Sequence, residues 1–341
     1  MAIHETEDSG SITDYPLKNE NYVDLLCRYT KKQMFKITEN LNDYIKTSLR
    51  KADYAAELVE LATRRFREFM YSANSKDLQI IAELMSDESK PFSSRKDIPG
   101  IVWIMVQFGF AILAYSESLV KHYIVIPKEI RKIYEEISMS ETTESKRELI
   151  THARSVLSAL ANLYGIYRYE HFLEIWQSLY GTEYSEDELM EAAQTGVWYL
   201  PSIVCLDQYI IQAILIDEPS IFDIYRKASR YPYYLPTIED IATYKDTYVV
   251  RDTPEYDAML NFLAPRASQG HNLDLLLQVL GFAILTDKTP AEIIDFLSGD
   301  NIFFASVNDV NRCLQLLADW KRNMRLWVTR GHKASELSAE A

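Results

Sequence analysis

Glycine and cysteine are scarce in this chain, with ten glycines and three cysteines among 341 residues. The sequence contains no G-x-x-x-x-G-K-[ST], G-x-G-x-x-G, H-E-x-x-H or G-x-S-x-G pattern, the spacings that build phosphate loops, zinc sites and nucleophile elbows. Its six histidines are scattered along the chain. We therefore expect a protein that is not an enzyme and that holds no cofactor and no metal ion.

The three cysteines, Cys27, Cys205 and Cys313, lie too far apart for a zinc or redox motif, so we expect free buried thiols in a reducing cytosol. Long apolar runs are missing as well. The most apolar segment, residues 101–115, contains Gln107 and is shorter than the ~20 residues that a membrane span needs. The N-terminus lacks a basic-then-apolar signal pattern. These features indicate a cytoplasmic protein that does not bind a membrane.

Positive charge is also in deficit, because 50 acidic residues against 36 basic ones give a net charge of −14. Phosphates repel an acidic surface, which argues against nucleic acid covering the whole protein but leaves room for one basic module. Hydrophobic residues make up 48% of the chain, and 23 residues are tyrosines. The apolar residues recur at helical spacing over much of the sequence. We predict a mainly α, multi-domain protein with one or two winged-helix-like units that carry small β-hairpins.

The first ordered module is predicted at residues 21–68, after a polar and disordered tail at residues 1–20. Thr30 is a good N-cap for a first helix, and a second helix follows a break at residues 42–43. The start of the first helix and the loop carry positive charge although the protein is acidic. The residues that we predict to contact phosphates are Lys31, Lys32, Lys46, Arg50 and Lys51.

This module resembles the small helix–loop–helix domain of SAP and Rho N-terminal type. The resemblance is carried by Tyr29-Thr30-Lys31-Lys32-Gln33-Met34 and by Ser48-Leu49-Arg50-Lys51-Ala52-Asp53. It implies nucleic-acid binding through basic residues of the loop and the second helix. The alternative is that these charges form a solvated helix face.

A unit with the element order of a winged helix is predicted at residues 69–147. Helices at 75–85 and 98–108 precede two β-like runs within residues 110–126, and Pro127 then opens another helix. The two runs are separated by polar turn residues, which favours a hairpin.

The same order of elements recurs in residues 148–231, with β-like runs at 197–206 and 209–216. The presumed recognition helix begins with the segment 186–191, whose four acidic residues would repel phosphates. We therefore expect this second unit to bind protein or to be structural. Its helices are predicted at residues 149–163, 169–180 and 185–195.

The C-terminal region, residues 232–341, begins with a turn-rich aromatic stretch up to Pro265 and then returns to helix. Those helices are predicted at residues 273–285, 290–297 and 307–326. The chain then carries the motif N-x-R-x-W-x-x-x-G-H-x-x-x-E-L. An exposed tail has no use for a tryptophan, so we predict a structural clasp with a buried ring and an arginine–carboxylate pair. The clasp residues are Asn323, Arg325, Trp327, Gly331 and His332.

This motif, together with the pattern G-F-x-I … I-V-I-P-K-E-I within residues 109–130, resembles a group of mostly helical, poorly characterised proteins of Gram-positive bacteria and their mobile elements. Those proteins often continue into a zinc-binding SEC-C tail, which has no counterpart after Leu337. The resemblance therefore implies architecture but no zinc site and no particular activity.

Two histidines lie near acidic residues in the sequence, and each allows either a chemical or a structural interpretation. Glu170-His171 with Glu174 has a spacing compatible with metal binding or acid–base work, but a hydrogen-bonded structural histidine explains it better. His332 with Glu336 is the other pair, and the clasp is the simpler explanation for it.

We therefore expect a non-enzymatic, nucleic-acid-associated regulatory or adaptor protein, in which the basic module contacts phosphates and the rest engages a protein partner. The alternative is an acidic protein-interaction factor, encoded by a mobile element, that blocks a basic surface of a host or defence protein. The net charge of −14 favours the second hypothesis, and the local basic cluster favours the first.

Overall fold

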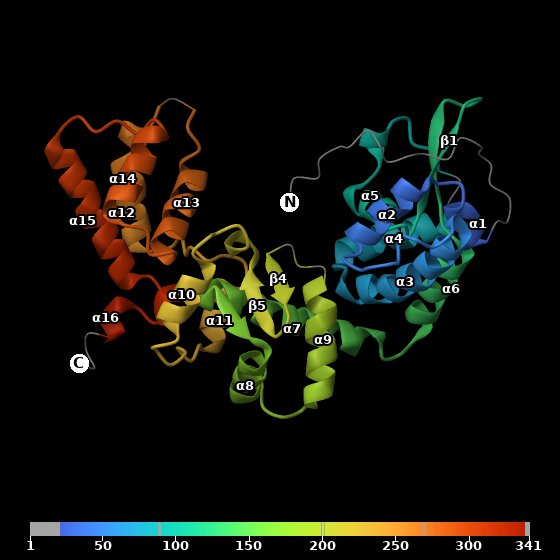
Figure 1. The fold of residues 1–341 in the computed structure, drawn as a ribbon, viewed down its shortest axis with the longest axis horizontal. Coiled ribbons are helices and arrows are strands. Elements are labelled where there is room, and N and C mark those ends of the chain that lie inside the picture. Colours follow the sequence, from blue (N-terminus) through green and yellow to red (C-terminus); the bar gives the residue numbers. More distant parts are fainter. Residues whose placement is uncertain (1–20, 88–89, 199, 201, 269, 338–341) are drawn as a thin grey trace. The chain divides into compact units, whose positions relative to one another are not determined.

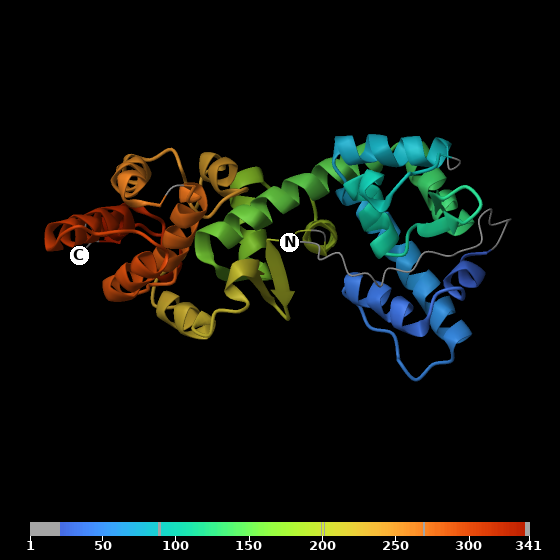
Figure 2. The same cartoon turned by 90° about the horizontal axis from the view of Figure 1, so that it is seen from above.

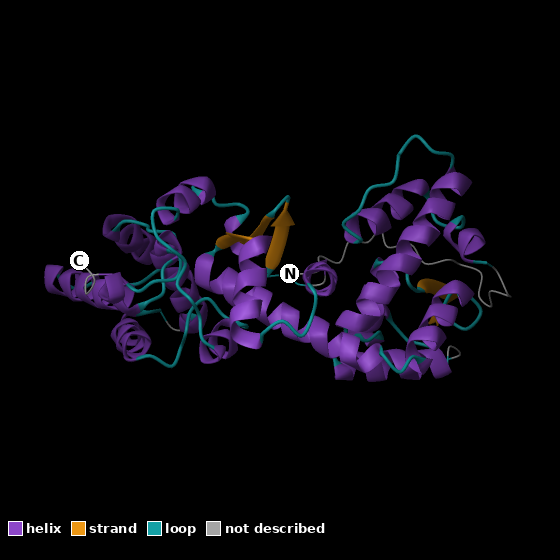
Figure 3. Ribbon diagram, turned by 90° about the horizontal axis from the view of Figure 1, so that it is seen from below, coloured by secondary structure: helices purple, strands orange, loops and turns teal. Residues whose placement is uncertain are grey.

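Helices dominate the computed structural model, which describes residues 21–87, 90–198, 200, 202–268 and 270–337 (Figure 1). Within these residues the strands form one two-stranded and one three-stranded antiparallel sheet, both small (Figure 3). The predicted mainly α fold with small hairpins is confirmed. The tail predicted to be disordered, residues 1–20, lies outside the described residues.

The chain divides into two compact units. Unit 1 comprises residues 1–151 and 194–199, and unit 2 comprises residues 152–193 and 200–341. Residues 21–68, which we expected to be a separate module, contribute to the same hydrophobic core as residues 69–137.

Unit 1 is built around the long helix α3 (Lys51–Ser72), whose apolar face supplies Phe66 and Phe69 to the core. Helix α2 begins at a capping box in which Thr30 and Gln33 satisfy each other's backbone groups. The other elements of this unit are α1 (Tyr22–Leu26), α2 (Lys31–Asn40), α4 (Ser75–Ser86), α5 (Gly100–Gln107), β1 (Ile112–Ser116), β2 (Lys121–Val125), α6 (Lys128–Met139) and the first part of α7 (Thr143–Tyr164).

Gly109 ends α5 in a conformation that only glycine adopts easily, with a φ of +75°. A Cβ atom here would lie 2.9 Å from Cγ2 of Ile37, so α2 packs directly against this turn. The Tyr22 hydroxyl donates a hydrogen bond to the Gly109 carbonyl from the other side. The predicted stop of this helix at Gly109 therefore has both a conformational and a packing cause.

The hairpin predicted within residues 110–126 is present. Strands β1 and β2 pair antiparallel, from Ile112 opposite Val125 to Ser116 opposite Lys121. Pro127 then serves as the N-cap residue of α6. The predicted order of helix, hairpin and helix is confirmed for this segment.

Unit 2 combines the second sheet with a set of C-terminal helices that share one core. Its helices are the remainder of α7, α8 (Tyr169–Tyr180), the first part of α9 (Glu186–Trp198), α10 (Ile221–Ala228), α11 (Ile238–Tyr244), α12 (Pro254–Leu263), α13 (Leu273–Leu285), α14 (Pro290–Gly299), α15 (Val307–Asn323) and α16 (Ala334–Leu337). Its strands are β3 (Ile166–Arg168), β4 (Ile203–Leu206) and β5 (Tyr209–Gln212), in the order β3-β5-β4.

Three sequence predictions for this unit were incomplete. The β-like runs were drawn too long, because Val197 belongs to the end of α9 and residues 213–215 form a 3₁₀ turn. The strand β3 was missed. The turn-rich stretch that begins at Pro232 also contains α11 and all of α12, whose starts are marked by N-cap bonds from Thr237 and Thr253.

Among the described residues, no helix combines the length and the apolar character that crossing a membrane requires.

Candidate functional site

Three of the predicted basic residues lie where the loop of residues 41–50 meets the start of α3, and Figure 2 shows this loop projecting away from α2 and α3. Lys46, Arg50 and Lys51 are exposed. Within the described part of the chain, none of these three side chains forms an ion pair. Arg50 is the N-cap residue of α3, and its side chain makes no capping bond.

Lys31 has a different role from the one that the sequence suggested. Its Nζ atom donates hydrogen bonds to the backbone oxygens of Thr47 and Leu49, at 2.6 and 2.7 Å. It also lies 5.4 Å from the centre of the Phe35 ring. Lys31 therefore fixes the loop against α2. Lys32, the second predicted contact on this helix, is exposed.

The loop also presents an aromatic side chain that sequence reasoning passed over. Tyr44 is 77% exposed, in the same loop as Lys46. Its neighbour Asp43 binds Arg64 and Arg65 of α3, so the negative charge at the base of the loop is neutralised. Exposed aromatic rings beside cations are typical of surfaces that stack nucleic-acid bases. We call Tyr44, Lys46, Arg50 and Lys51 the basic loop.

The C-terminal motif lies against the body of unit 2, and the predicted burial of Trp327 is confirmed. The indole Nε1 donates to the backbone oxygen of Asn162 at 2.9 Å. The ring also covers Gly165, where an added Cβ would lie only 2.8 Å from the indole. The Trp327 ring is therefore packed against the body of unit 2, and its N–H group has a hydrogen-bond acceptor.

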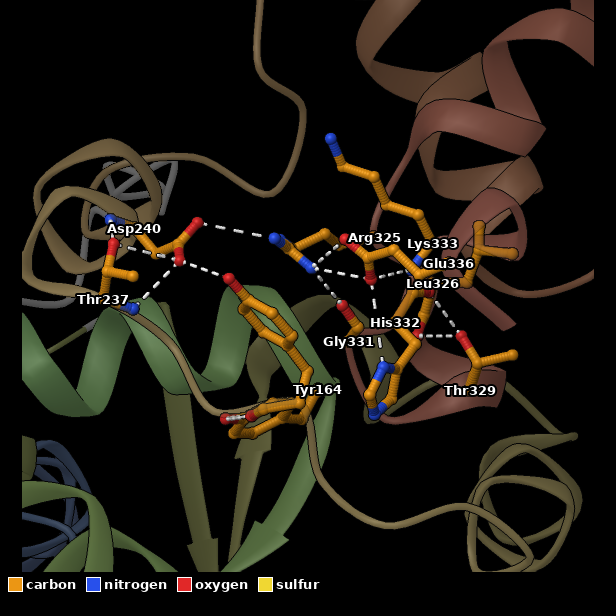
Figure 4. A network of polar contacts seen from close by, with 11 residues as sticks. Tyr164, Thr237, Asp240, Arg325, Leu326, Thr329, Gly331, His332, Lys333 and Glu336 are labelled. Atoms are coloured by element: carbon orange, nitrogen blue, oxygen red, sulfur yellow. Dashed lines mark hydrogen bonds and ion pairs between the residues drawn. The ribbon is translucent and has the colours of Figure 1, made fainter. Parts of the chain in front are cut away.

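Arg325 forms the predicted arginine–carboxylate pair, and Figure 4 shows it between Asp240 of α11 and Glu336 of α16. Its guanidinium also lies over the ring of Tyr234 at 3.4 Å and donates to the Gly331 carbonyl at 3.1 Å. The motif is thereby tied to α11 and to the loop before it, which lie far earlier in the chain.

The remaining motif residues also have local roles. Asn323 donates to Glu255 at 2.7 Å. Gly331 has a φ of +82°, and a Cβ there would touch the Tyr164 ring at 3.0 Å. His332 Nδ1 lies 3.8 Å from a Glu336 oxygen. Among the described residues no cluster of three histidine, cysteine or acidic side chains could hold a metal ion.

A second cluster lies in unit 2 around the histidine that the sequence analysis considered structural. His171 Nδ1 lies 2.9 Å from a carboxylate oxygen of Glu174, and the ring is buried. Both residues line a cavity of about 420 Å³. We call it the polar pocket, and its lining residues are Arg168, Glu170, His171, Glu174, Tyr225, Tyr233 and Arg330.

The expectation of three buried thiols holds for only one of them. Cys205 is exposed, Cys27 is half-buried and Cys313 is buried. Burial raises the pKa of the Cys313 thiol to about 11, so that this group is neutral at physiological pH.

Comparison of the chain with protein-family models, with curated proteins and with solved structures finds no match. The resemblances to the SAP and Rho modules and to the Gram-positive group therefore stay predictions. The functional argument rests on the chemistry of the chain's own side chains.

Proposed function

We propose that this protein is a non-enzymatic, nucleic-acid-associated regulatory or adaptor protein whose basic loop binds the phosphate backbone. The observation that carries the proposal is the exposure of Lys46, Arg50 and Lys51 at the start of α3, without ion-pair partners among the described residues. Cations that are not committed elsewhere can exchange their counterions for phosphates.

The position of these side chains adds to their effect. The first backbone N–H groups of a helix have no partner within the helix, and the helix dipole makes this end positive. Since α3 has 22 residues and no side-chain cap from Arg50, its N-terminus favours an anion next to the basic loop. Asp53 in the first turn offsets part of that charge.

Tyr44 indicates which form of nucleic acid the loop would prefer. An exposed ring can stack on an unpaired base, which a base inside a duplex does not allow. We therefore expect single strands to bind more tightly than duplexes. The net charge of −14 repels phosphates elsewhere on the surface, so the affinity should be moderate and sensitive to salt.

The test is fluorescence anisotropy of labelled single-stranded and duplex DNA and RNA with the full chain at low salt. The triple variant Lys46→Ala, Arg50→Ala, Lys51→Ala should bind at least about ten-fold more weakly, because it loses three phosphate contacts. The matched control is Lys76→Ala, Lys128→Ala, Lys132→Ala, which removes the same charge from exposed positions on α4 and α6. An equal loss of nucleic-acid affinity in the two triple variants would show a general effect of net charge and would contradict the proposal.

A second candidate function is the binding of a basic protein surface. It is favoured by the exposed acidic residues Glu183, Glu186 and Asp187 at the start of α9, none of which has an ion-pair partner in the described ranges. A pull-down from nuclease-treated lysate discriminates the two functions. A protein partner retained by the basic-loop triple but lost by Glu183→Gln, Glu186→Gln, Asp187→Asn would favour this candidate, and the reverse pattern would favour nucleic acid.

A further inference from the structure

The polar pocket brings together side chains from five parts of unit 2. Arg168 ends β3, three residues lie on α8, Tyr225 lies on α10, Tyr233 lies in the loop before α11, and Arg330 belongs to the C-terminal motif. A volume of about 420 Å³ is within the range of small-molecule sites in proteins. Every lining residue carries a polar or charged group.

A stack of three groups forms one wall of the pocket. The His171 ring lies 3.8 Å from the Tyr233 ring centre, at an interplanar angle of 20°. The Arg330 guanidinium carbon lies 4.2 Å from the same centre. Two groups this close to one ring cannot share a face, so Tyr233 is held between them. The stack fixes the positions of an imidazole and a guanidinium.

Arg330 is positioned more firmly than a surface arginine. It donates from Nη1 to the Tyr231 carbonyl at 3.1 Å, and its backbone is in the left-handed region with a φ of 49°. Its Nε is buried and has no hydrogen-bond partner among the described residues. A buried donor without an acceptor is costly, and an anion in the pocket would remove that cost.

His171 supplies the opposite kind of group. Its Nδ1 faces the Glu174 carboxylate at 2.9 Å and therefore carries the proton. Burial lowers the pKa of His171 and outweighs the Glu174 carboxylate, which acts to raise it, while Arg330 makes a smaller contribution in the lowering direction. The ring is then neutral at physiological pH, and Nε2 is an acceptor. Nε2 is buried and has no partner in the described structure, so it can accept a hydrogen bond from a ligand hydroxyl.

Arg168 provides a second guanidinium for the same pocket. It is exposed, and its guanidinium carbon lies 5.5 Å from the Tyr209 ring centre. Burial raises the pKa of Tyr233 to about 12, while Arg330 and Arg168 both act to lower it. The two guanidinium groups come from different elements and both line the pocket.

We propose that the polar pocket binds a small, hydroxyl-bearing phosphate ester, with Arg168 and Arg330 on the phosphate and His171 accepting from a hydroxyl. Two guanidinium groups match the geometry and the charge of a phosphate dianion. Glu170, which also lines the pocket, disfavours a purely anionic ligand and can accept from hydroxyls. Sugar phosphates and nucleoside monophosphates share this chemistry.

Isothermal titration calorimetry of the full chain with ribose 5-phosphate, adenosine 5′-monophosphate, ribose and inorganic phosphate tests this proposal. We expect one site per chain for at least one of the two esters, and at least ten-fold weaker binding of ribose and of inorganic phosphate. Tight binding of the nucleotide alone would narrow the ligand to nucleotides. The absence of binding by both esters would overturn the proposal.

Arg168→Ala should weaken binding of the ester at least ten-fold without altering the unliganded melting temperature, because the side chain is exposed. Arg251→Ala is the matched control, since it removes an exposed arginine of unit 2 that pairs with Asp274 outside the pocket. Equal affinity in wild type and Arg168→Ala would contradict the proposal. The basic-loop triple should bind the ester normally, so this result is independent of nucleic-acid binding.

Discussion

Two lysines that the sequence predicts to contact phosphates have different surroundings in the fold. Lys31 donates to two loop carbonyls, whereas Lys46 is exposed in the loop that Lys31 holds. A helical register cannot reveal this difference, because the acceptors belong to residues 16 and 18 positions further along. The sequence therefore marked a charged region but could not assign the role of each cation.

We predict that Lys31→Ala lowers the free energy of unfolding of unit 1 by roughly 1 kcal/mol, since hydrogen bonds from a charged group are lost. Lys46→Ala should change it by less than about 0.5 kcal/mol, as is usual for an exposed side chain, and should weaken nucleic-acid binding. Urea denaturation and anisotropy measure the two effects. Equal stability of both variants would show that Lys31 does not fix the loop.

The three thiols should differ in reactivity. Cys313 is fully buried and its pKa is raised to about 11 by burial, so at pH 8 it is protonated as well as shielded. Burial also raises the pKa of Cys205, but this thiol is exposed. We predict that a thiol reagent modifies Cys205 in the native protein and Cys313 only after denaturation, as read by peptide mass spectrometry. Rapid modification of Cys313 in the native protein would indicate that the core of unit 2 opens readily.

At the scale of elements, an acidic residue in a turn of unit 2 joins two helices. Asp287, in the turn between α13 and α14, binds Lys227 of α10 at 2.9 Å and Lys321 of α15 at 2.8 Å. Burial acts to raise the pKa of Asp287, but hydrogen bonds from Lys321 and Lys227 outweigh it, so the pKa is lowered. Its φ of 59° is a conformation that asparagine also tolerates.

A carboxyl with a lowered pKa stabilises the fold above its unfolded value of about 4, and this contribution is lost as the pH falls through the folded value. We therefore predict that Asp287→Asn destabilises unit 2 at pH 7, and that the difference from wild type shrinks below about pH 4. Urea unfolding across this range measures it. Asp246→Asn, at an exposed carboxylate, is the control. A difference that persists undiminished in acid would exclude the charge as its cause.

Elements with strong local signals were predicted well, and elements defined by distant partners were not. The range of α13 matches the prediction because apolar periodicity and the Asn272 cap lie within the helix itself. Strand β3 has three residues and exists through its pairing with β5, more than 40 positions away, so no local pattern marks it. The pairing of His171 with Glu174 was visible as spacing, but its place beside Arg330 depends on the C-terminal motif folding back.

At the scale of the whole molecule, the two units have separate hydrophobic cores. Trp327 belongs to the core of unit 2 and packs on Gly165. Trp327→Ala should cost about 3–5 kcal/mol, the usual range for removing a buried aromatic ring. Hydrogen exchange should therefore accelerate throughout unit 2 and stay unchanged in the core of unit 1.

Tyr44→Ala, at an exposed ring, is the control for stability. An unchanged melting temperature combined with lost binding would make Trp327 part of a binding surface.

The central claim is that three cations of the basic loop contact phosphates, and the salt dependence of binding tests it most directly. Each neutralised phosphate contributes a slope of ~0.7–0.9 to a plot of log affinity against log salt concentration. The triple variant at Lys46, Arg50 and Lys51 should therefore lower the magnitude of the slope by roughly 2–3 relative to wild type. The control triple at Lys76, Lys128 and Lys132 should leave it unchanged. A wild type that binds no nucleic acid at low salt, or a basic-loop triple with an unaltered slope, would contradict the account.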